Sequence, residues 1–130
     1  MLSIETQFKD GSPSRHVYGA HPSGYTIYTA EGRAMAIYES EGRKPAETDT
    51  ERAALIRSMI AVSATYRLDG NDKYIAKIDV SWNPSLRGQE QVRFYKVDGD
   101  RLEVTTGWAP SPNLPGKPVT RASFLFERAK

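Results

Sequence analysis

The chain has 130 residues and a net charge of +2, from 18 Lys and Arg against 16 Asp and Glu. This length suits a single domain, residues 1–130, with one hydrophobic core, and the composition is that of an ordinary soluble globular protein. The basic residues are scattered, which argues against nucleic acid as a partner. There is no cysteine, so a disulfide framework, a Cys-bound zinc site and a thiol nucleophile are excluded.

The first ten residues, MLSIETQFKD, contain neither a basic n-region nor a long apolar run, so they do not resemble a signal peptide. No stretch approaches the roughly 20 apolar residues that a membrane-spanning helix needs. We therefore expect a cytoplasmic protein without a membrane partner.

Alternating or β-branched stretches predict an all-β fold of about eight strands. They lie at residues 2–8, 24–29, 33–40, 63–68, 73–82, 89–97, 101–108 and 119–128. Most connections are short, as an up-and-down antiparallel meander requires, and eight strands can close a barrel around side chains or one small ligand. Closure would also remove exposed sheet edges. Residues 109–118 contain four prolines and are expected to form a long irregular loop.

One segment changes from the two-residue period to a helical one. Thr48, with Glu51 three residues later, forms a capping box that marks a helix start. The sequence predicts a helix over about residues 49–62, lying across an open end of the barrel. Its apolar face would consist of Leu55, Ile56, Met59 and Ile60.

The strand at 73–82 has one apolar face, which should line the barrel interior: Tyr74, Ala76, Ile78, Val80 and Trp82. If residues 83–88 are the loop to the next strand, Ile78 faces Arg93 and Ala76 faces Tyr95. A two-residue Asp98-Gly99 turn would then pair Arg93 with Val104.

The pairings of the strand at 89–97 with both of its neighbours place Gln91, Arg93 and Tyr95 inside the barrel. A one-residue slip or a bulge would instead put Val92 and Phe94 inside and leave Arg93 in water.

A guanidinium inside a barrel requires a carboxylate, carbonyl groups, water or an anionic ligand. The sequence offers Glu90, Gln91, Tyr66 and Tyr28 as partners for Arg93. A structural arginine and a ligand-binding arginine are both compatible with this pattern.

The predicted strands are rich in tyrosine, and two tryptophans stand near strand ends. An aromatic lumen with hydroxyl tips suits a flat, mostly apolar ligand, although the same rings could simply fill the barrel. The candidate ligand-binding residues are Tyr25, Tyr28, Tyr66, Trp82, Gln91, Arg93, Tyr95 and Trp108.

The two histidines, His16 and His21, lie five residues apart in a loop and lack a third ligand, so we expect no metal site. His21 could act as a general acid or base with Tyr25 or Tyr28, or belong to a structured turn at the rim. The sequence contains no nucleophile elbow, phosphate loop or Gly-x-Gly-x-x-Gly motif, and we expect no cofactor.

Four segments together resemble one known family: HPSGYTIYTAEGR (21–33), residues 51–70, VSWNPSLRGQEQVRFYKVDGDRLEVTT (80–106) and FLFER (124–128). They look like the lipocalin-like domain family, which comprises small calycin-type barrels without one common substrate. The resemblance covers nearly the whole chain and implies a barrel with a cavity. Members usually open with a Gly-x-Trp strand, whereas this chain begins Met1-Leu2-Ser3-Ile4, so the seal of the barrel base is an open question.

Three functions fit these observations. The first is a barrel that binds a small hydrophobic or aromatic molecule. The second is a cofactor-independent isomerase or cyclase in which Arg93 stabilises an enolate or carboxylate and Tyr95, another tyrosine or His21 moves the proton. The third is a packed interaction module without a cavity. The loop at 109–118 is expected to be either a lid or a homodimer contact.

Overall fold

The computed structural model describes residues 1–111 and 113–129. Its longer strands are β1 (Ser3–Phe8), β2 (Ser23–Tyr28), β3 (Arg33–Glu39), β4 (Met59–Asp69), β5 (Lys73–Ser81), β6 (Glu90–Asp98), β7 (Arg101–Thr106) and β9 (Val119–Glu127). A short strand, β8 (Ala109–Pro110), a helix, α1 (Asp49–Arg57), and a 3-10 turn, η1 (Pro84–Leu86), complete these elements. The predicted mainly-β fold is confirmed, and β8 corrects the prediction that 109–118 holds no regular structure.

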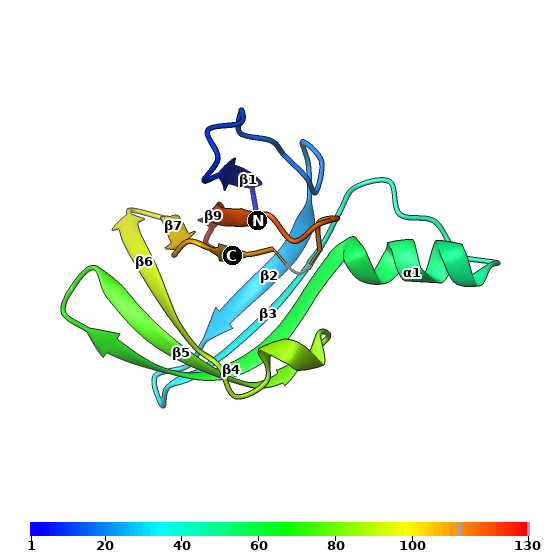
Figure 1. Ribbon diagram of the computed structural model, residues 1–130. Coiled ribbons are helices and arrows are strands. Elements are labelled where there is room, and N and C mark those ends of the chain that lie inside the picture. The colour runs from blue at the N-terminus through cyan, green and yellow to red at the C-terminus, as the bar shows by residue number, and fades with distance from the viewer. Residues whose placement is uncertain (112, 130) are drawn as a thin grey trace.

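All the strands belong to one antiparallel sheet with the order β1-β9-β7-β6-β5-β4-β3-β2, and β8 pairs with β9. The sheet curls into a barrel around its inner face (Figure 1). The order ends on β1 and β2, so the expectation that closure removes the edges is wrong. The two edges approach where the Met1 ammonium donates to the Gly24 carbonyl at 3.2 Å. The edge of β1 that no strand covers is partly paired, because Thr6 exchanges two backbone hydrogen bonds with Arg15.

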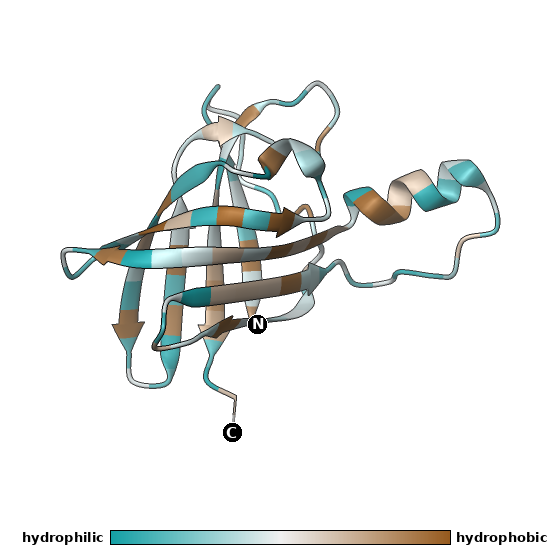
Figure 2. Cartoon of the chain, turned by 90° about the horizontal axis from the view of Figure 1, so that it is seen from below, coloured by the Kyte–Doolittle hydropathy of each residue, from teal (hydrophilic) through white to brown (hydrophobic). Residues whose placement is uncertain are grey.

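The helix is shorter than predicted and does not cover the barrel. It ends at Arg57, because Ser58 caps it by donating to the Leu55 carbonyl through both its N–H and its hydroxyl. Residues 59–62 instead begin β4 and pair with β3, where the β-branched Ile60 and Val62 suit a sheet. α1 projects away from the barrel (Figures 1 and 2), none of its residues is buried, and Ile56 is 48% exposed.

The core follows from the alternation of apolar and polar residues along the strands, visible as bands of colour in Figure 2. Ile4 is the one large side chain, among the described residues, that is fully buried. The other buried hydrophobic residues are Phe8, Tyr18, Tyr38, Ala64, Tyr74, Ala76, Ile78, Val104 and Phe126.

A bulge in β5 corrects one predicted interior residue. Ala64 of β4 pairs with Ile78, but the preceding Ser63 pairs with Val80, so Asp79 is an extra residue in β5. An extra residue reverses which side of the sheet the next side chain faces. Val80 therefore faces outward and is 59% exposed, whereas Tyr74, Ala76 and Ile78 face inward as predicted.

Four tyrosines fill one end of the barrel, the end formed by the β2–β3, β4–β5 and β6–β7 turns. The rings of Tyr28, Tyr66 and Tyr74 pack edge to face with centroids 5.6 to 5.9 Å apart, and Tyr95 packs on Tyr74 at 6.0 Å. The Tyr66 hydroxyl donates to the Thr29 carbonyl at 2.6 Å, which fixes the cluster to the β2–β3 turn. This tyrosine cluster occupies the end whose seal the sequence left open.

Replacing Ile4 by Ala should lower the free energy of unfolding by about 2–5 kcal/mol, because a fully buried side chain leaves a cavity behind. Ile37→Ala is the matched control, since Ile37 lies on the outer face of β3, and it should cost less than about 1 kcal/mol. Urea unfolding of both variants measures the difference. Equal losses would contradict the placement of the core.

Replacing Ala54 by Pro should abolish α1 yet change the free energy of unfolding of the barrel by less than about 0.5 kcal/mol, since no residue of α1 is buried. Circular dichroism reports the loss of helix and urea unfolding reports stability. A loss near the full cost of a helix-breaking proline, about 3 kcal/mol, would show that α1 packs on the barrel.

Candidate functional site

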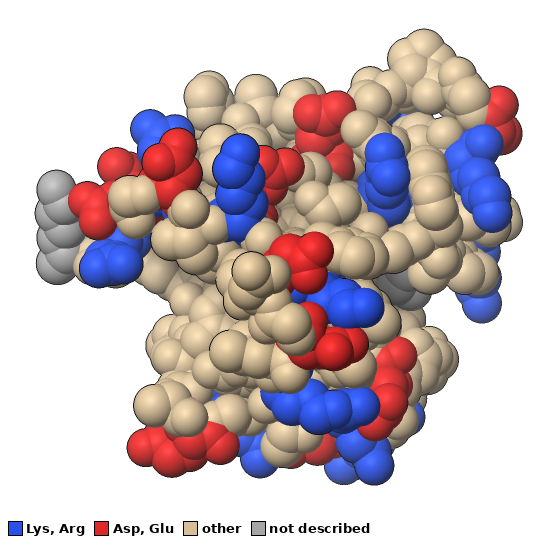
Figure 3. Space-filling view, turned by 90° about the vertical axis from the view of Figure 1, so that its left-hand side faces the viewer, with Lys and Arg blue, Asp and Glu red and all other residues tan. Residues whose placement is uncertain are grey.

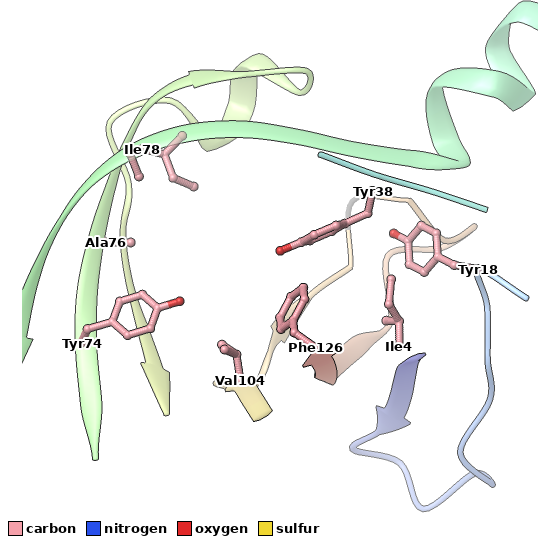
Figure 4. Packing of buried hydrophobic residues seen from close by; sticks show 9 residues of the cluster. Ile4, Tyr18, Tyr38, Tyr74, Ala76, Ile78, Val104 and Phe126 are labelled. Atoms are coloured by element: carbon pink, nitrogen blue, oxygen red, sulfur yellow. The ribbon is translucent and has the colours of Figure 1, made fainter. Parts of the chain in front are cut away.

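The curled sheet encloses a cavity of about 850 Å³. In Figure 4, Tyr74, Ala76 and Ile78 stand on one wall and Tyr38 and Phe126 on another, with the hydroxyls of Tyr38 and Tyr74 directed into the space between. Most of the wall is aromatic or aliphatic. Its polar side chains include Thr6, Thr26, Gln91, Arg93, Thr106 and Asn113.

Arg93 reaches the cavity from β6 because of its register with both neighbouring strands. It pairs with Tyr74 of β5 and Thr106 of β7, whereas the sequence predicts pairing with Ile78 and Val104. The predicted pairs are wrong by four and two residues. Both numbers are even, so the inner face of β6 is unchanged. Val92 and Phe94 lie on the outer face, 40% and 46% exposed, and the alternative with Arg93 in water does not occur.

The register shifts arise in the connections. Beyond Ile78, whose backbone bonds to Gln89 and Gly88 at 3.0 and 2.7 Å, β5 and β6 separate into a wide loop that holds η1. The β6–β7 turn has Gly99 and Asp100 at its centre, not Asp98-Gly99. Gly99 has φ of +59°, the positive φ that a type II′ turn requires at its first central residue.

The Arg93 guanidinium is bound by neutral acceptors. Nη2 donates to Oε1 of Gln91, and Nη1 donates to the Val92 carbonyl at 3.2 Å. Within residues 1–111 and 113–129, no carboxylate lies within 4 Å of it. Burial lowers the pKa of Arg93, and the neighbouring Tyr74 and Tyr28 act in the opposite direction. An arginine is nevertheless charged at neutral pH.

Three buried phenols, those of Tyr28, Tyr38 and Tyr74, lie near enough to this charge to influence its pKa. The hydroxyls of Tyr28 and Tyr74 are hydrogen-bonded at 2.8 Å, and the Tyr38 hydroxyl is bonded to the Thr26 hydroxyl. Burial is the main cause that raises the pKa of each of the three tyrosines above its usual value. They therefore remain protonated at neutral pH, and each hydroxyl can both donate and accept.

Two loops line the end of the cavity away from the tyrosine cluster, here called the mouth. Trp82 follows β5 and is held there by its backbone N–H, which donates to the Ala61 carbonyl at 2.8 Å. Trp108 precedes β8, beneath the Arg121 guanidinium at 4.7 Å from the ring centre. Asn113 attaches the proline-rich loop to the barrel, since its Nδ2 donates to the Tyr18 hydroxyl at 2.9 Å and to the Met59 carbonyl at 3.0 Å.

Five of the eight predicted ligand-binding residues line the cavity: Tyr28, Trp82, Gln91, Arg93 and Trp108. Tyr66 and Tyr95 belong to the tyrosine cluster and lie outside the cavity lining.

Tyr25 is 68% exposed on the outer face of β2, because residues an odd number apart in a strand face opposite sides and Tyr28 faces inward. His21 is exposed in a turn, where its N–H donates to Oε1 of Glu41 at 3.3 Å, and it does not line the cavity.

Four further residues line the cavity that are not among the candidates predicted from the sequence: Tyr38, Tyr74, Thr26 and Phe126. Tyr74 was placed on the inner face, but as part of an apolar wall. The alternation of β3 and β9 contains the signal for Tyr38 and Phe126. The alternation alone does not say which face of these strands is the inner one. That choice depends on the packing of Tyr38 against Phe126 across the barrel, at 5.8 Å between ring centres.

Charge on the outside is mixed, and Figure 3 shows basic and acidic side chains interspersed over one face. Within the described part of the chain, no three His, Asp or Glu side chains are close enough to hold a metal ion. No described helix is long and apolar enough to cross a membrane.

Stability should fall as the pH rises above about 10, the usual pKa of tyrosine. Tyr28, Tyr38 and Tyr74 have raised pKa values in the fold, so the unfolded chain loses these protons first and binds fewer of them. Above pH 10, each phenol should lower the free energy of unfolding by about 1.4 kcal/mol per pH unit. Below pH 10 the stabilisation that each phenol provides is fully present.

Urea unfolding at intervals between pH 8 and 11 measures the slope for the wild type. The variant carrying Tyr28→Phe, Tyr38→Phe and Tyr74→Phe should show a flatter dependence, whatever its absolute stability. An identical slope in both proteins would show that these phenols do not ionise with unfolding.

Comparison with known proteins agrees with this architecture. A search of curated proteins finds no match to the chain. The sequence profile of the lipocalin-like domain family matches residues 1–129, which is nearly the whole chain and includes every strand that forms the cavity. The curled antiparallel barrel is the fold expected of that family. The chain therefore belongs to the lipocalin-like domain family.

Proposed function

We propose that this barrel binds a small hydrophobic or aromatic molecule in its cavity. The observation that carries the proposal is the cavity of about 850 Å³, whose volume falls in the range of known ligand pockets. Membership of the lipocalin-like domain family supports a lipocalin-type binder at the level of the family. The cavity and the family membership together favour a small molecule over a macromolecular partner.

The chemistry of the walls supports the apolar character of the ligand. Tyr74 and Ile78 on one wall and Tyr38 and Phe126 on the other present aromatic and aliphatic surface to the cavity. Trp82 at the mouth adds a further ring. Aromatic walls bury a flat molecule efficiently, and the phenol hydroxyls can bond to a few oxygen atoms on it. A packed interaction module would fill this space with side chains instead.

The enzyme alternative receives less support. An isomerase or cyclase would need a group in the cavity that exchanges protons near neutral pH. His21 lies outside the cavity lining. The phenols of Tyr28 and Tyr38 line the cavity, but burial raises their pKa values and makes them weaker acids. Binding without turnover therefore fits these groups better.

The test is binding of N-phenyl-1-naphthylamine, a neutral dye that fluoresces in apolar surroundings. It should bind saturably at one site per chain. Ala76→Trp introduces a large ring on the inner face of β5 and should weaken binding at least about tenfold, a change of about 1.4 kcal/mol.

Lys77→Trp is the matched control, because the neighbouring side chain points outward and is exposed. It should leave the affinity unchanged. Thermal melting checks that both variants are folded. If the dye does not bind, or binds equally well to the Ala76→Trp variant, the cavity is not the binding site.

A further inference from the structure

We propose that the molecule bound in this cavity carries a single negative charge on an oxygen-bearing group, such as a carboxylate, and that this group pairs with Arg93. The inference rests on the proposed function and adds the chemical class of the ligand. It follows from the Arg93 contacts, from the hydroxyls beside it and from the arrangement of the cavity between its two ends.

Arg93 is not among the described arginines that form ion pairs with carboxylates. Five other arginines have a carboxylate within 4 Å: Arg33, Arg43, Arg52, Arg67 and Arg128. In the described part of the chain Arg93 has none, although it lies in a wall of low polarity where a charge needs compensation most. Glu90, on the same strand, also borders the cavity, but its carboxylate is paired with Arg67 at 3.5 Å. The charge on Arg93 is thus left without an ionic partner from the described residues.

The donors of Arg93 are only partly used. A guanidinium has five N–H donors, and those of Arg93 reach two acceptors, Gln91 and the Val92 carbonyl. Arg93 lines the cavity, so the donors that these two acceptors leave unused can reach a ligand there. A carboxylate could accept two of them side by side.

The neighbouring phenols supply a further donor. Tyr74 lies directly opposite Arg93 in the β5–β6 register, and its hydroxyl is 2.8 Å from that of Tyr28. Two hydroxyls that share one hydrogen bond have one hydrogen left to donate. Their raised pKa values keep that hydrogen in place at neutral pH. Arg93 and this tyrosine pair together form a donor group suited to an oxyanion.

The position of this donor group orients the ligand. The tyrosine pair belongs to the filled end of the barrel, and Arg93 lies between Tyr74 of β5 and Thr106 of β7, whereas Trp82 and Trp108 lie at the mouth. Apolar side chains such as Ile78 and Phe124 line the space between them. The ligand would therefore enter with its charged group first and leave its apolar part between these side chains and the mouth.

Two dyes with the same ring system test the charge. N-phenyl-1-naphthylamine is neutral, and 1-anilinonaphthalene-8-sulfonate adds one sulfonate to it. The wild type should bind the sulfonate at least about tenfold more tightly. Arg93→Met should abolish that preference, so that the affinities for the two dyes differ by less than about threefold. Arg93→Lys should retain part of the preference. Arg101→Met, which removes the same charge from an exposed position on β7, should change neither affinity.

A second measurement needs no variant and stands even if Arg93→Met fails to fold. Dodecanoate and dodecanol compete with the neutral dye on the wild-type protein, and dodecanoate should displace it at a concentration at least about tenfold lower. Equal displacement by the two compounds overturns the inference while the proposed function stands. Failure of the neutral dye to bind at all would overturn the proposed function itself.

Discussion

Every side chain that a strand contributes to this cavity is there because alternate residues of a β-strand face opposite sides of the sheet. In β6 this constraint turns Gln91 and Arg93 inward together and leaves Val92 and Phe94 exposed on the outer face. Phe94 would be the better core residue by hydrophobicity alone. Phe94 could point inward in place of Arg93 only if all the side chains of β6 moved to the opposite face of the sheet. A charge in the wall is thus the consequence of a face that also carries Tyr95.

The tyrosines make that charge tolerable. Tyr28 and Tyr74 place hydroxyl dipoles beside Arg93 while their rings fill the end of the barrel. The same side chains therefore pack as core and bond as polar groups. This double use explains why part of the interior is built from tyrosine where phenylalanine would bury as much apolar surface.

The sequence was sufficient for the fold and for the inner faces of the central strands, because the two-residue period of β5 and β6 is a local property. It was insufficient for the pairing of Arg93, since the wide loop that holds η1 and the Gly99-Asp100 turn set the register. Val80 was misplaced by a bulge that depends on β4. The end of α1 was misplaced because pairing with β3 draws residues 59–62 into a strand. Each error arose where a neighbouring segment, rather than the local pattern, decides the structure.

The cavity also has a thermodynamic consequence for the empty protein. A space of about 850 Å³ lacks the packing contacts that a filled core would provide. A ligand that binds only the folded chain raises the free energy of unfolding by about 2.7 kcal/mol when its concentration is 100 times its dissociation constant. Proteases and chaperones in a cell act on the unfolded fraction. The lifetime of this protein would then follow the supply of its ligand, and its abundance would report how much of that ligand is present.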